Sequence, residues 1–383
     1  MFLSNKKFFL ALSILVGMIV GAGIFGLPYV VEKSGLIPSF FYFLILGLII
    51  ILVHLFFGEI VLRTKEKKRL PGFVQSYLGG KWKTFVVLST FVGLTGALLA
   101  YIILSGNFLK ILFSPWFSLD SFYFSLIFWA ILVYFIFRGI KIIAPAEIFT
   151  NFIFFLIVFI VFFFALPKVN FQNFTLFNLP EVFLPYGVIL FSLVGLPAIP
   201  EAVEVLKSAE DKKILKKVIL TSFLIIILLY FLFIFVVIGT CGKATSSDTF
   251  QGLTPFLGTK IIFFGALAAV ITLADSFLVV GLYLKNVLIY DYKFPKFSAS
   301  LFVSGLPLIL FLAGFRGFIE TIGIVGTIVG TIESVLIILI FKNIKKLGNR
   351  KPEYSLKIPS FLLYFLILVF VFGLFLQIFY FLK

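Results

Sequence analysis

The sequence predicts an all-α polytopic membrane protein with eleven transmembrane helices, two of which are interrupted near the middle of the bilayer. The 383-residue chain is 62% hydrophobic and has a mean hydropathy of +1.22, which is too apolar for a soluble domain of this length. It divides into runs of about 20 apolar residues, the length that crosses a bilayer as a helix. Two of these runs contain glycine and proline near their centre. Such long runs do not fit the short, alternating strands of a membrane β-barrel.

The expected spans follow one another with short polar connections. They cover residues 7–31, 38–62, 83–113, 121–137, 145–166, 181–206, 214–239, 259–290, 297–314, 317–341 and 358–382. The first run has no small-residue cleavage pattern at its end, so we expect a retained span and not a signal peptide. The spans 121–137, 145–166, 214–239 and 358–382 are rich in Phe, Ile, Leu and Val almost throughout, and we expect them to face lipid.

The positive charge of the chain indicates membrane orientation and not a nucleic-acid partner. The formal net charge is +16, and the basic residues lie in the short connections between spans. With the N-terminus in the cytoplasm, 25 of the 32 Lys and Arg residues fall inside and seven outside, as the positive-inside rule requires. The sequence therefore predicts a multi-pass protein of the cytoplasmic membrane, with the C-terminus outside. One Cys and one His provide no disulfide and too few ligands for a zinc site.

The first interruption lies in the stretch Val16–Tyr29, VGMIVGAGIFGLPY, which carries four glycines and a proline. Glycine costs about 1 kcal/mol relative to alanine in a helix interior, and proline removes a backbone donor. Lipid cannot satisfy the freed backbone groups, so a broken helix at this depth must lie inside protein or beside a cavity. We expect residues 17–23 to be unwound and to line a substrate site.

The second interruption lies in the sixth span, where Gly195, Pro197 and Pro200 fall within residues 181–206. Two ordinary kinked helices are one explanation. Interrupted segments at matching positions of two halves are, however, typical of transporters built from inverted repeats. We therefore expect one transmembrane domain over residues 1–383, with repeats at about 7–166 and 181–341 and an extra helix at about 358–382.

Several short motifs resemble one transporter superfamily. Gly21–Tyr29 resembles the first-helix signature of the amino acid–polyamine–organocation superfamily, and Gly58–Thr64 resembles the end of the second helix in its amino acid/auxin permease branch. Ala100–Ile102 and Asp275–Leu278 are similar to segments of the hydroxy/aromatic amino acid permeases. The resemblance implies the leucine-transporter (LeuT) fold, a 5+5 inverted repeat with discontinuous helices 1 and 6, and transport of an amino acid.

Broken helices suit a zwitterionic amino acid because they expose N–H groups at one end and carbonyls at the other. By the resemblance, the carboxylate would be held by the N–H groups of Ala22, Gly23 and Ile24. The ammonium would be held by the carbonyls of Ile19, Phe191 and Val194, with the Phe191 ring covering the substrate. Candidates for side-chain specificity are Gly96, Ala97, Ala100, Tyr101 and Gly195. None of these is charged, which favours a neutral substrate.

Asp275 lies deep in the eighth span, where an ionised carboxylate costs at least ~2.5 kcal/mol without a partner. Thr272, Asp275 and Ser276 share one helical face. The Asp–Ser pair resembles the second sodium site of neurotransmitter:sodium symporters, which implies further ligands from Thr272 and from the Gly17 and Val20 carbonyls. A protonatable Asp275 and a purely structural Asp275 are the alternatives.

Three other polar residues within the spans are candidates for gating or proton transfer. Glu201 could form a cytoplasmic gate. Glu333 is either a proton carrier or a hydrogen-bonded buried carboxyl. His54 is either a proton relay or, as we favour, a neutral histidine bonded inside the bundle. At the end of the second span, Glu59 and Arg63 are spaced to pair.

These features predict a secondary active transporter that moves a neutral amino acid by alternating access, with Na⁺ or H⁺ as the coupling ion and no other cofactor. Proton-coupled permeases and exchangers are the alternatives. An amino-acid sensor is a weaker one, because no connection exceeds about 20 residues and none could hold a soluble partner-binding domain. One His, one Cys and scattered carboxylates give no catalytic cluster, so we expect no enzyme. The sequence leaves the oligomeric state open.

Overall fold

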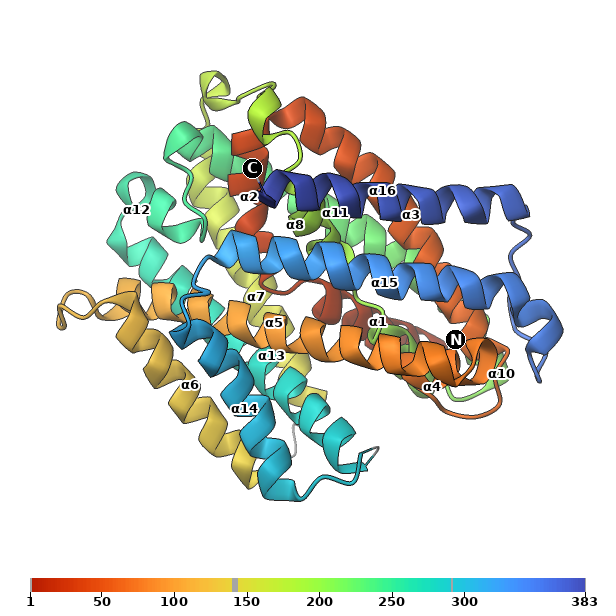
Figure 1. Ribbon diagram of the computed structural model, residues 1–383. Coiled ribbons are helices and arrows are strands. Elements are labelled where there is room, and N and C mark those ends of the chain that lie inside the picture. Colours follow the sequence, from red (N-terminus) through yellow and green to blue (C-terminus); the bar gives the residue numbers. More distant parts are fainter. Residues whose placement is uncertain (1, 140–143, 291, 383) are drawn as a thin grey trace.

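The computed structural model describes residues 2–139, 144–290 and 292–382, and this part of the chain contains helices and no strand (Figure 1). The α-helices are α1 (Phe2–Ile19), α2 (Gly23–Ser34), α3 (Leu36–Leu62), α4 (Leu70–Leu78), α5 (Gly80–Phe113), α6 (Ser121–Arg138), α7 (Ala144–Ala165), α8 (Pro185–Leu193), α9 (Ala198–Val205), α10 (Ala209–Lys212), α11 (Leu215–Cys241), α12 (Phe250–Leu257), α13 (Thr259–Tyr290), α14 (Lys296–Leu312), α15 (Phe318–Leu347) and α16 (Ser360–Leu382). Short 3₁₀ turns are η1 (Leu166–Lys168), η2 (Phe171–Asn173), η3 (Leu179–Glu181) and η4 (Gly242–Ala244). The predicted all-α class is confirmed.

The described residues include nine helical segments that are long and apolar enough to cross a membrane, and the bent pair α1–α2 makes a tenth. The helix in the expected ninth span, Lys296–Leu312, has 17 residues and is shorter than the others. A polytopic helical membrane protein is therefore confirmed, whereas the exact number of eleven spans stays a prediction.

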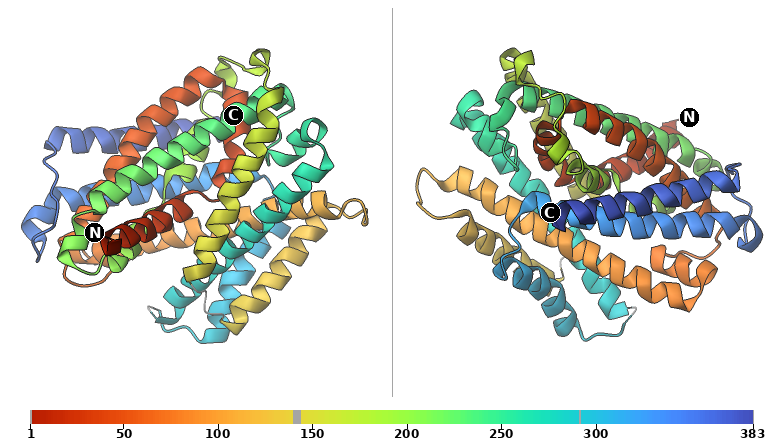
Figure 2. Two further views of the ribbon diagram at one scale, coloured as in Figure 1. Left: turned by 180° about the vertical axis from the view of Figure 1, so that it is seen from behind. Right: turned by 45° about the horizontal axis from the view of Figure 1, so that its top comes forward.

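The two interrupted helices lie at the centre of the bundle. α1 contacts α9 and α2 contacts α8, so the two interrupted helices pack against each other along their lengths. α3 and α11 pack against this pair from one side, and α15 packs against α8. α5, α15 and α16 run side by side, and α6 and α14 cross them at an angle (Figures 1 and 2).

The lipid-facing helices are partly those expected. In α6 and in α16, only 28% of the most apolar 18-residue stretch is buried inside the protein, and in the span of α7 the share is 33%. These three helices therefore face outward, as predicted. The prediction that residues 214–239 face lipid is wrong, because 61% of the most apolar stretch of α11 is buried inside the protein. Hydropathy cannot separate a helix that faces lipid from one that packs inside the bundle, because both are apolar.

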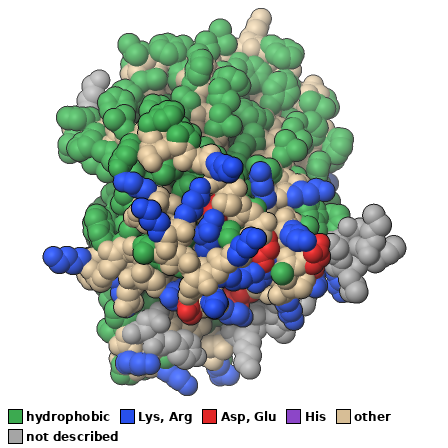
Figure 3. All heavy atoms as spheres, turned by 90° about the vertical axis from the view of Figure 1, so that its right-hand side faces the viewer, with side chains coloured by type: hydrophobic (Ala, Val, Ile, Leu, Met, Phe, Trp, Pro, Cys, Tyr) green, Lys and Arg blue, Asp and Glu red, His purple; other side chains and the backbone are tan. Residues whose placement is uncertain are grey.

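One end of the bundle carries most of the Lys and Arg side chains, and we call it the basic face (Figure 3). It includes the chain near the N-terminus, α4, α10 and the connection between α15 and α16, whereas the C-terminus lies toward the opposite end (Figure 1).

The signature Gly58-Glu59 holds the α15–α16 connection on this face. The buried Glu59 carboxylate accepts hydrogen bonds from Arg63 Nε at 2.8 Å, Ser355 Oγ at 3.0 Å and Leu356 N at 2.6 Å. A Cβ on Gly58 would lie 2.2 Å from the Tyr354 hydroxyl, so the glycine leaves room for the connection. The predicted Glu59–Arg63 pair is confirmed.

Candidate functional site

The first break is shorter than the sequence suggests. α1 ends at Ile19, residues 20–22 are not helical, and α2 begins at Gly23 with its axis bent by 53°. Gly17, which we expected to be unwound, belongs to α1. No backbone carbonyl of the described residues accepts a hydrogen bond from the N–H groups of Ala22, Gly23 or Ile24. These three donors therefore lie free at the positive end of α2.

The second break separates α8, which ends at Leu193, from α9, which begins at Ala198. His54 on α3 holds this break in place. Its Nε2 accepts the N–H of Gly195 at 3.3 Å, and its Nδ1 bonds the Ile50 carbonyl at 2.9 Å. Because Nε2 accepts, Nδ1 carries the proton that it donates, and the fully buried ring is neutral. In a continuous helix, the Gly195 N–H would donate to the Phe191 carbonyl, four residues earlier. Because this N–H donates to His54 instead, the Phe191 carbonyl has no backbone donor.

Two glycines allow the breaks to touch each other. A Cβ on Gly23 would lie 2.3 Å from Ser192 Oγ and 3.1 Å from its Cα. A Cβ on Gly195 would lie 2.2 Å from Ile19 Cγ1. Each break therefore requires a residue without a side chain at the point where it meets the other.

Tyr230 on α11 joins the carboxyl ends of both broken helices. Its buried hydroxyl lies 2.7 Å from the Ser192 carbonyl on α8 and 3.3 Å from the Ile19 carbonyl on α1. The Ile19 carbonyl also accepts the Gly21 N–H at 3.0 Å, and because Tyr230 has a single hydroxyl proton, that proton is best placed on the nearer Ser192 carbonyl. The sequence did not indicate a role for Tyr230, because it lies in a span that we expected to face lipid. Its polar hydroxyl among apolar residues is the one feature of the sequence that indicates a buried hydrogen bond.

A central cavity of about 160 Å³ lies beside both breaks. Of the predicted substrate residues, it is lined by Ile19, Ala22, Gly23, Ala97, Tyr101, Phe191, Val194 and Gly195. Ile24, Gly96 and Ala100 do not line it: Ile24 and Ala100 are fully buried, and a Cβ on Gly96 would lie 2.2 Å from Val325 Cγ2. The structure adds one face of α15 to the wall, from Val325 to Glu333.

Glu333 and Thr90 form the polar part of this wall. The Glu333 side chain is 7% exposed, and its Oε1 accepts the Thr90 hydroxyl at 3.3 Å. The other gating candidate, Glu201, does not line this cavity but a second one described below.

The central cavity joins a hollow on the basic face. This hollow, of about 600 Å³, shares Arg69, Pro71, Thr90 and Tyr283 with the central cavity. Several cations line it, namely Lys67, Lys68, Arg69 and Lys83. The central cavity and this hollow are therefore neighbours, separated by no more than these four residues.

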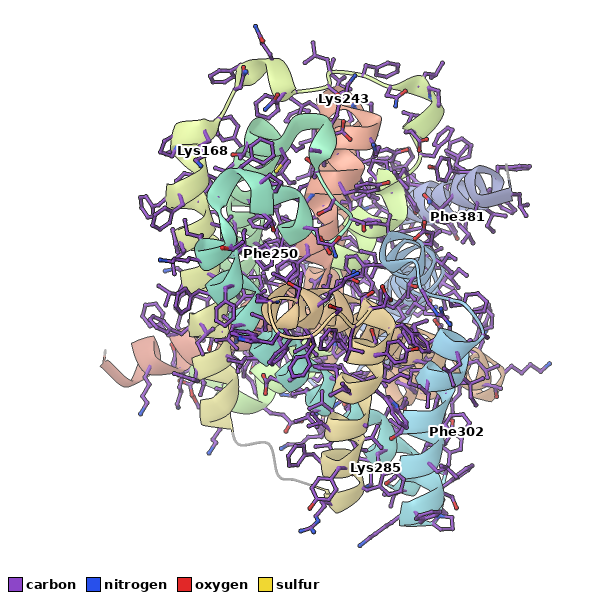
Figure 4. All side chains as sticks on the ribbon, turned by 90° about the vertical axis from the view of Figure 1, so that its left-hand side faces the viewer. Lys168, Lys243, Phe250, Lys285, Phe302 and Phe381 are labelled. Carbon is purple, nitrogen blue, oxygen red and sulfur yellow. The ribbon has the colours of Figure 1, made fainter. Side chains whose placement is uncertain are left out.

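An aromatic cluster closes the path toward the opposite face. The Phe25 ring on α2 contacts the rings of Phe108, Phe154, Phe233 and Phe250, with centroids 5.1 to 6.4 Å apart. Thr249 Oγ1 donates to the Phe25 carbonyl at 2.6 Å and ties α12 to this cluster. Figure 4 shows Phe250 within the bundle, below the turns that carry Lys168 and Lys243. The central cavity thus has a hollow beside it on the side of the basic face and the aromatic cluster on the other side.

A smaller cavity of about 70 Å³ brings together all five residues of the predicted cation site. They are Gly17, Val20, Thr272, Asp275 and Ser276. No backbone N–H of the described residues donates to the carbonyls of Gly17 and Val20, which lie at the negative end of α1. The oxygen groups in this cavity are those that a hard cation prefers. The described residues contain no group of three His, Cys, Asp or Glu side chains that could hold a metal ion.

α7 contributes to this cavity, which the sequence did not indicate. Thr150 Oγ1 donates to Asp275 Oδ2 at 2.9 Å, and the Asn151 side chain packs against Gly17. The Thr272 hydroxyl donates its proton to the Ala268 carbonyl of its own helix at 2.9 Å, which leaves the lone pairs of the hydroxyl oxygen available to a cation.

The small cavity and the central cavity meet at the first break. Four residues line both, namely Met18, Gly21, Tyr101 and Val280. A change in the backbone of the break therefore reaches both cavities.

The chain is similar to known proteins over nearly its whole length, in sequence and in fold. The sequence profile of the tryptophan/tyrosine permease family matches residues 4–379. The crystal structure of MhsT in complex with L-phenylalanine superimposes with a TM-score of 0.67 over 98% of this chain and 98% of that chain, at 14% sequence identity. This likeness confirms the LeuT fold. No curated protein sequence matches the chain.

Proposed function

The chain belongs to the tryptophan/tyrosine permease family, and from that premise we propose that it is a symporter that carries an aromatic amino acid together with Na⁺. Membership of this family makes it an amino acid transporter and a multi-pass membrane protein, not an enzyme. The observation that carries the proposal is the contact between the two cavities: the oxygen-lined cavity at Asp275 and the central cavity share the first break.

The substrate would lie across both breaks. Its carboxylate would accept the free N–H groups of Ala22 and Gly23, which line the central cavity at the positive end of α2. Ile24 does not line the cavity, so its predicted contact would require the break to move. The ammonium would be held mainly by the carbonyls of Phe191 and Val194, which accept no backbone N–H, and the Ile19 carbonyl, which accepts the Gly21 N–H, keeps a second lone pair for it. The carbonyls of Phe191 and Val194 lie at the negative end of α8, which suits a cation.

The aromatic side chain would lie against α5 and α15, where Gly93, Ala97 and Gly326 line the cavity. Tryptophan and tyrosine are proposed from the family, and the L-phenylalanine bound to MhsT is a ligand of the same class. Few charged side chains line the cavity, so a neutral aromatic substrate meets mostly apolar walls.

Na⁺ would be held by the carboxylate of Asp275, the Ser276 hydroxyl, Thr272 and the carbonyls of Gly17 and Val20. A cation here would fix the end of α1 to α13 and so stabilise the break that binds the substrate. In the alternative, a proton on Asp275 replaces the cation, or Glu333 beside Thr90 carries the proton along the path to the basic face. We assign His54 a positioning role at the second break, because both of its nitrogens are bonded.

We propose that the basic face is cytoplasmic, in line with the positive-inside rule. The N-terminus then lies inside the cell and the C-terminus outside, in the cytoplasmic membrane. In that orientation the structure would be the inward-facing state, and the Phe25 cluster would be the closed outer gate. The two repeats, at about 7–166 and 181–341, would rearrange around the breaks to open the outer side.

Purified protein in proteoliposomes is expected to accumulate labelled L-tryptophan or L-tyrosine when an inward Na⁺ gradient is imposed at equal pH on both sides. Uptake is measured against vesicles in which choline replaces Na⁺. Accumulation driven equally well by an inward proton gradient without Na⁺ would contradict Na⁺ coupling and support the proton alternative. Exchange of labelled for unlabelled substrate without net accumulation would contradict symport.

Replacing Tyr230 with Phe is expected to raise the KM for substrate about tenfold. The substitution removes the hydroxyl that lies beside the Ser192 and Ile19 carbonyls and holds the ends of the two broken helices together. The maximal rate is expected to change much less, since Tyr230 positions the breaks and does not touch the cation. Concentration-dependent uptake at saturating Na⁺ measures both parameters. The control is Tyr123→Phe, whose side chain is exposed on α6; an equal KM shift in both variants would contradict the positioning role.

A further inference from the structure

A crevice of about 840 Å³ lies between α5, α14 and α15, on the side of α5 away from the breaks. Its walls are apolar and include Leu88, Phe91, Val92, Leu99, Phe302, Leu306, Leu310 and Ile324. Several of these side chains are exposed, Leu88 by 60% and Val92 by 53%. Figure 4 shows Phe302 on α14, near the edge of the molecule. The crevice therefore opens toward the hydrocarbon of the bilayer.

One end of the crevice carries a cation and a carboxylate close together. Arg316 and Glu320 both line it, and they flank Gly317 at the start of α15. Arg316 Nε donates to the Phe311 carbonyl at 3.1 Å, and its guanidinium lies over the Phe122 ring at 4.6 Å. A Cβ on Gly317 would lie 2.1 Å from Glu320 Oε2, so the carboxylate folds back over the residue that follows Arg316.

The fixed position of Arg316 leaves its terminal nitrogens available. No acceptor among the described residues bonds its Nη1 or Nη2, and no described ion pair joins it to Glu320. An arginine held by its Nε and by a ring presents two parallel donors, the arrangement that matches a phosphate. The neighbouring carboxylate matches an ammonium.

We propose that this crevice binds one phospholipid with a zwitterionic headgroup, phosphatidylethanolamine in chemical class, its phosphate on Arg316 and its ammonium on Glu320. One acyl chain would run from Arg316 along the apolar side chains of Leu310, Leu306 and Ile324. Arg316 to Ile324 spans about 12 Å along α15 at 1.5 Å per residue, which fits within one leaflet of the hydrocarbon core, about 15 Å thick. The proposal does not depend on the coupling ion or the substrate.

The lipid would stabilise a wall that the central cavity shares. Val325 lines both the crevice and the central cavity, and it packs on Gly96. Occupancy of the crevice would therefore hold α5 and α15 together behind the substrate cavity.

The test is native mass spectrometry of delipidated full-length protein to which phosphatidylethanolamine or phosphatidylglycerol is added. The wild type is expected to retain one phosphatidylethanolamine with at least about tenfold higher affinity than Arg316→Gln, the loss expected for a charge-assisted pair. Glu320→Gln is expected to remove the preference over phosphatidylglycerol. Lys110→Gln, a cation outside the crevice, is expected to change neither value.

A second pair of variants tests the crevice itself. Leu306→Trp fills it, whereas Leu301→Trp alters an exposed position on the same helix that does not line it. The proposal expects loss of the retained lipid in Leu306→Trp only, with uptake still measurable in both. Equal retention in the two variants, or equal affinity for both lipids in the wild type, would overturn it.

Discussion

Replacing Asp275 with Asn is expected to abolish Na⁺-driven accumulation of substrate. The carboxylate lines the small cavity with the Gly17 and Val20 carbonyls, and it is the only carboxylate among the five predicted ligands. Removing one partner of a buried charge pair costs roughly 3–5 kcal/mol, which corresponds to a Na⁺ affinity roughly 10²- to 4 × 10³-fold lower. Uptake as a function of Na⁺ concentration in proteoliposomes measures the change.

The matched control is Asp120→Asn, which removes the same charge from an exposed carboxylate at the α5–α6 connection. Its Na⁺ dependence is expected to equal that of the wild type. If Asp275→Asn keeps a normal Na⁺ dependence, the cation site is assigned wrongly. If instead uptake loses its response to a pH gradient, Asp275 carries a proton.

Replacing Gly23 with Ala is expected to lower substrate affinity roughly 10- to 100-fold, the range that overpacking of about 1–3 kcal/mol implies. The new Cβ would lie 3.0 Å from Ser192 Cβ and 3.1 Å from its Cα, so side-chain rotation alone cannot relieve the contact. α2 must shift against α8, which displaces the N–H groups proposed to hold the carboxylate. Equilibrium binding of labelled tryptophan measures the loss.

Gly305→Ala is the control for this substitution, since nothing lies within 4 Å of a Cβ added at that helical glycine in α14. Its affinity for substrate is expected to be unchanged. Normal affinity in Gly23→Ala would show that the first break does not hold the substrate carboxylate.

The parts of the fold that could be predicted from the sequence are those that contain residues uncommon in a membrane-spanning helix. Gly21, Gly23 and Pro28 are unusual inside an apolar run, and the structure breaks the first span beside them. Asp275 is unusual for its charge, and helical spacing alone places Thr272 and Ser276 on the same face. The cavity that joins them to Gly17 confirms the juxtaposition, and their role as cation ligands stays a proposal.

The partners of these features could not be predicted, because they depend on which helices meet. Tyr230 lies in an apolar run whose hydropathy predicts a lipid-facing helix. It contacts the two breaks only because α11 packs against the broken helices. Gly96 and Ala97 are adjacent in one stripe of small residues, yet Ala97 lines the central cavity and Gly96 packs on Val325. A turn of about 100° per residue separates them, and the sequence does not fix which face of α5 meets the cavity.

A cation at Asp275 and a substrate at the two breaks are expected to stabilise each other through the shared first break. The most direct test is to measure the Kd of the purified protein for L-tryptophan in NaCl and in choline chloride at the same pH and ionic strength. Coupling between two sites is typically 1–3 kcal/mol, so we expect a Kd at least about 5-fold lower in NaCl, and no such difference in Asp275→Asn. An identical Kd in the two salts for the wild type would contradict it.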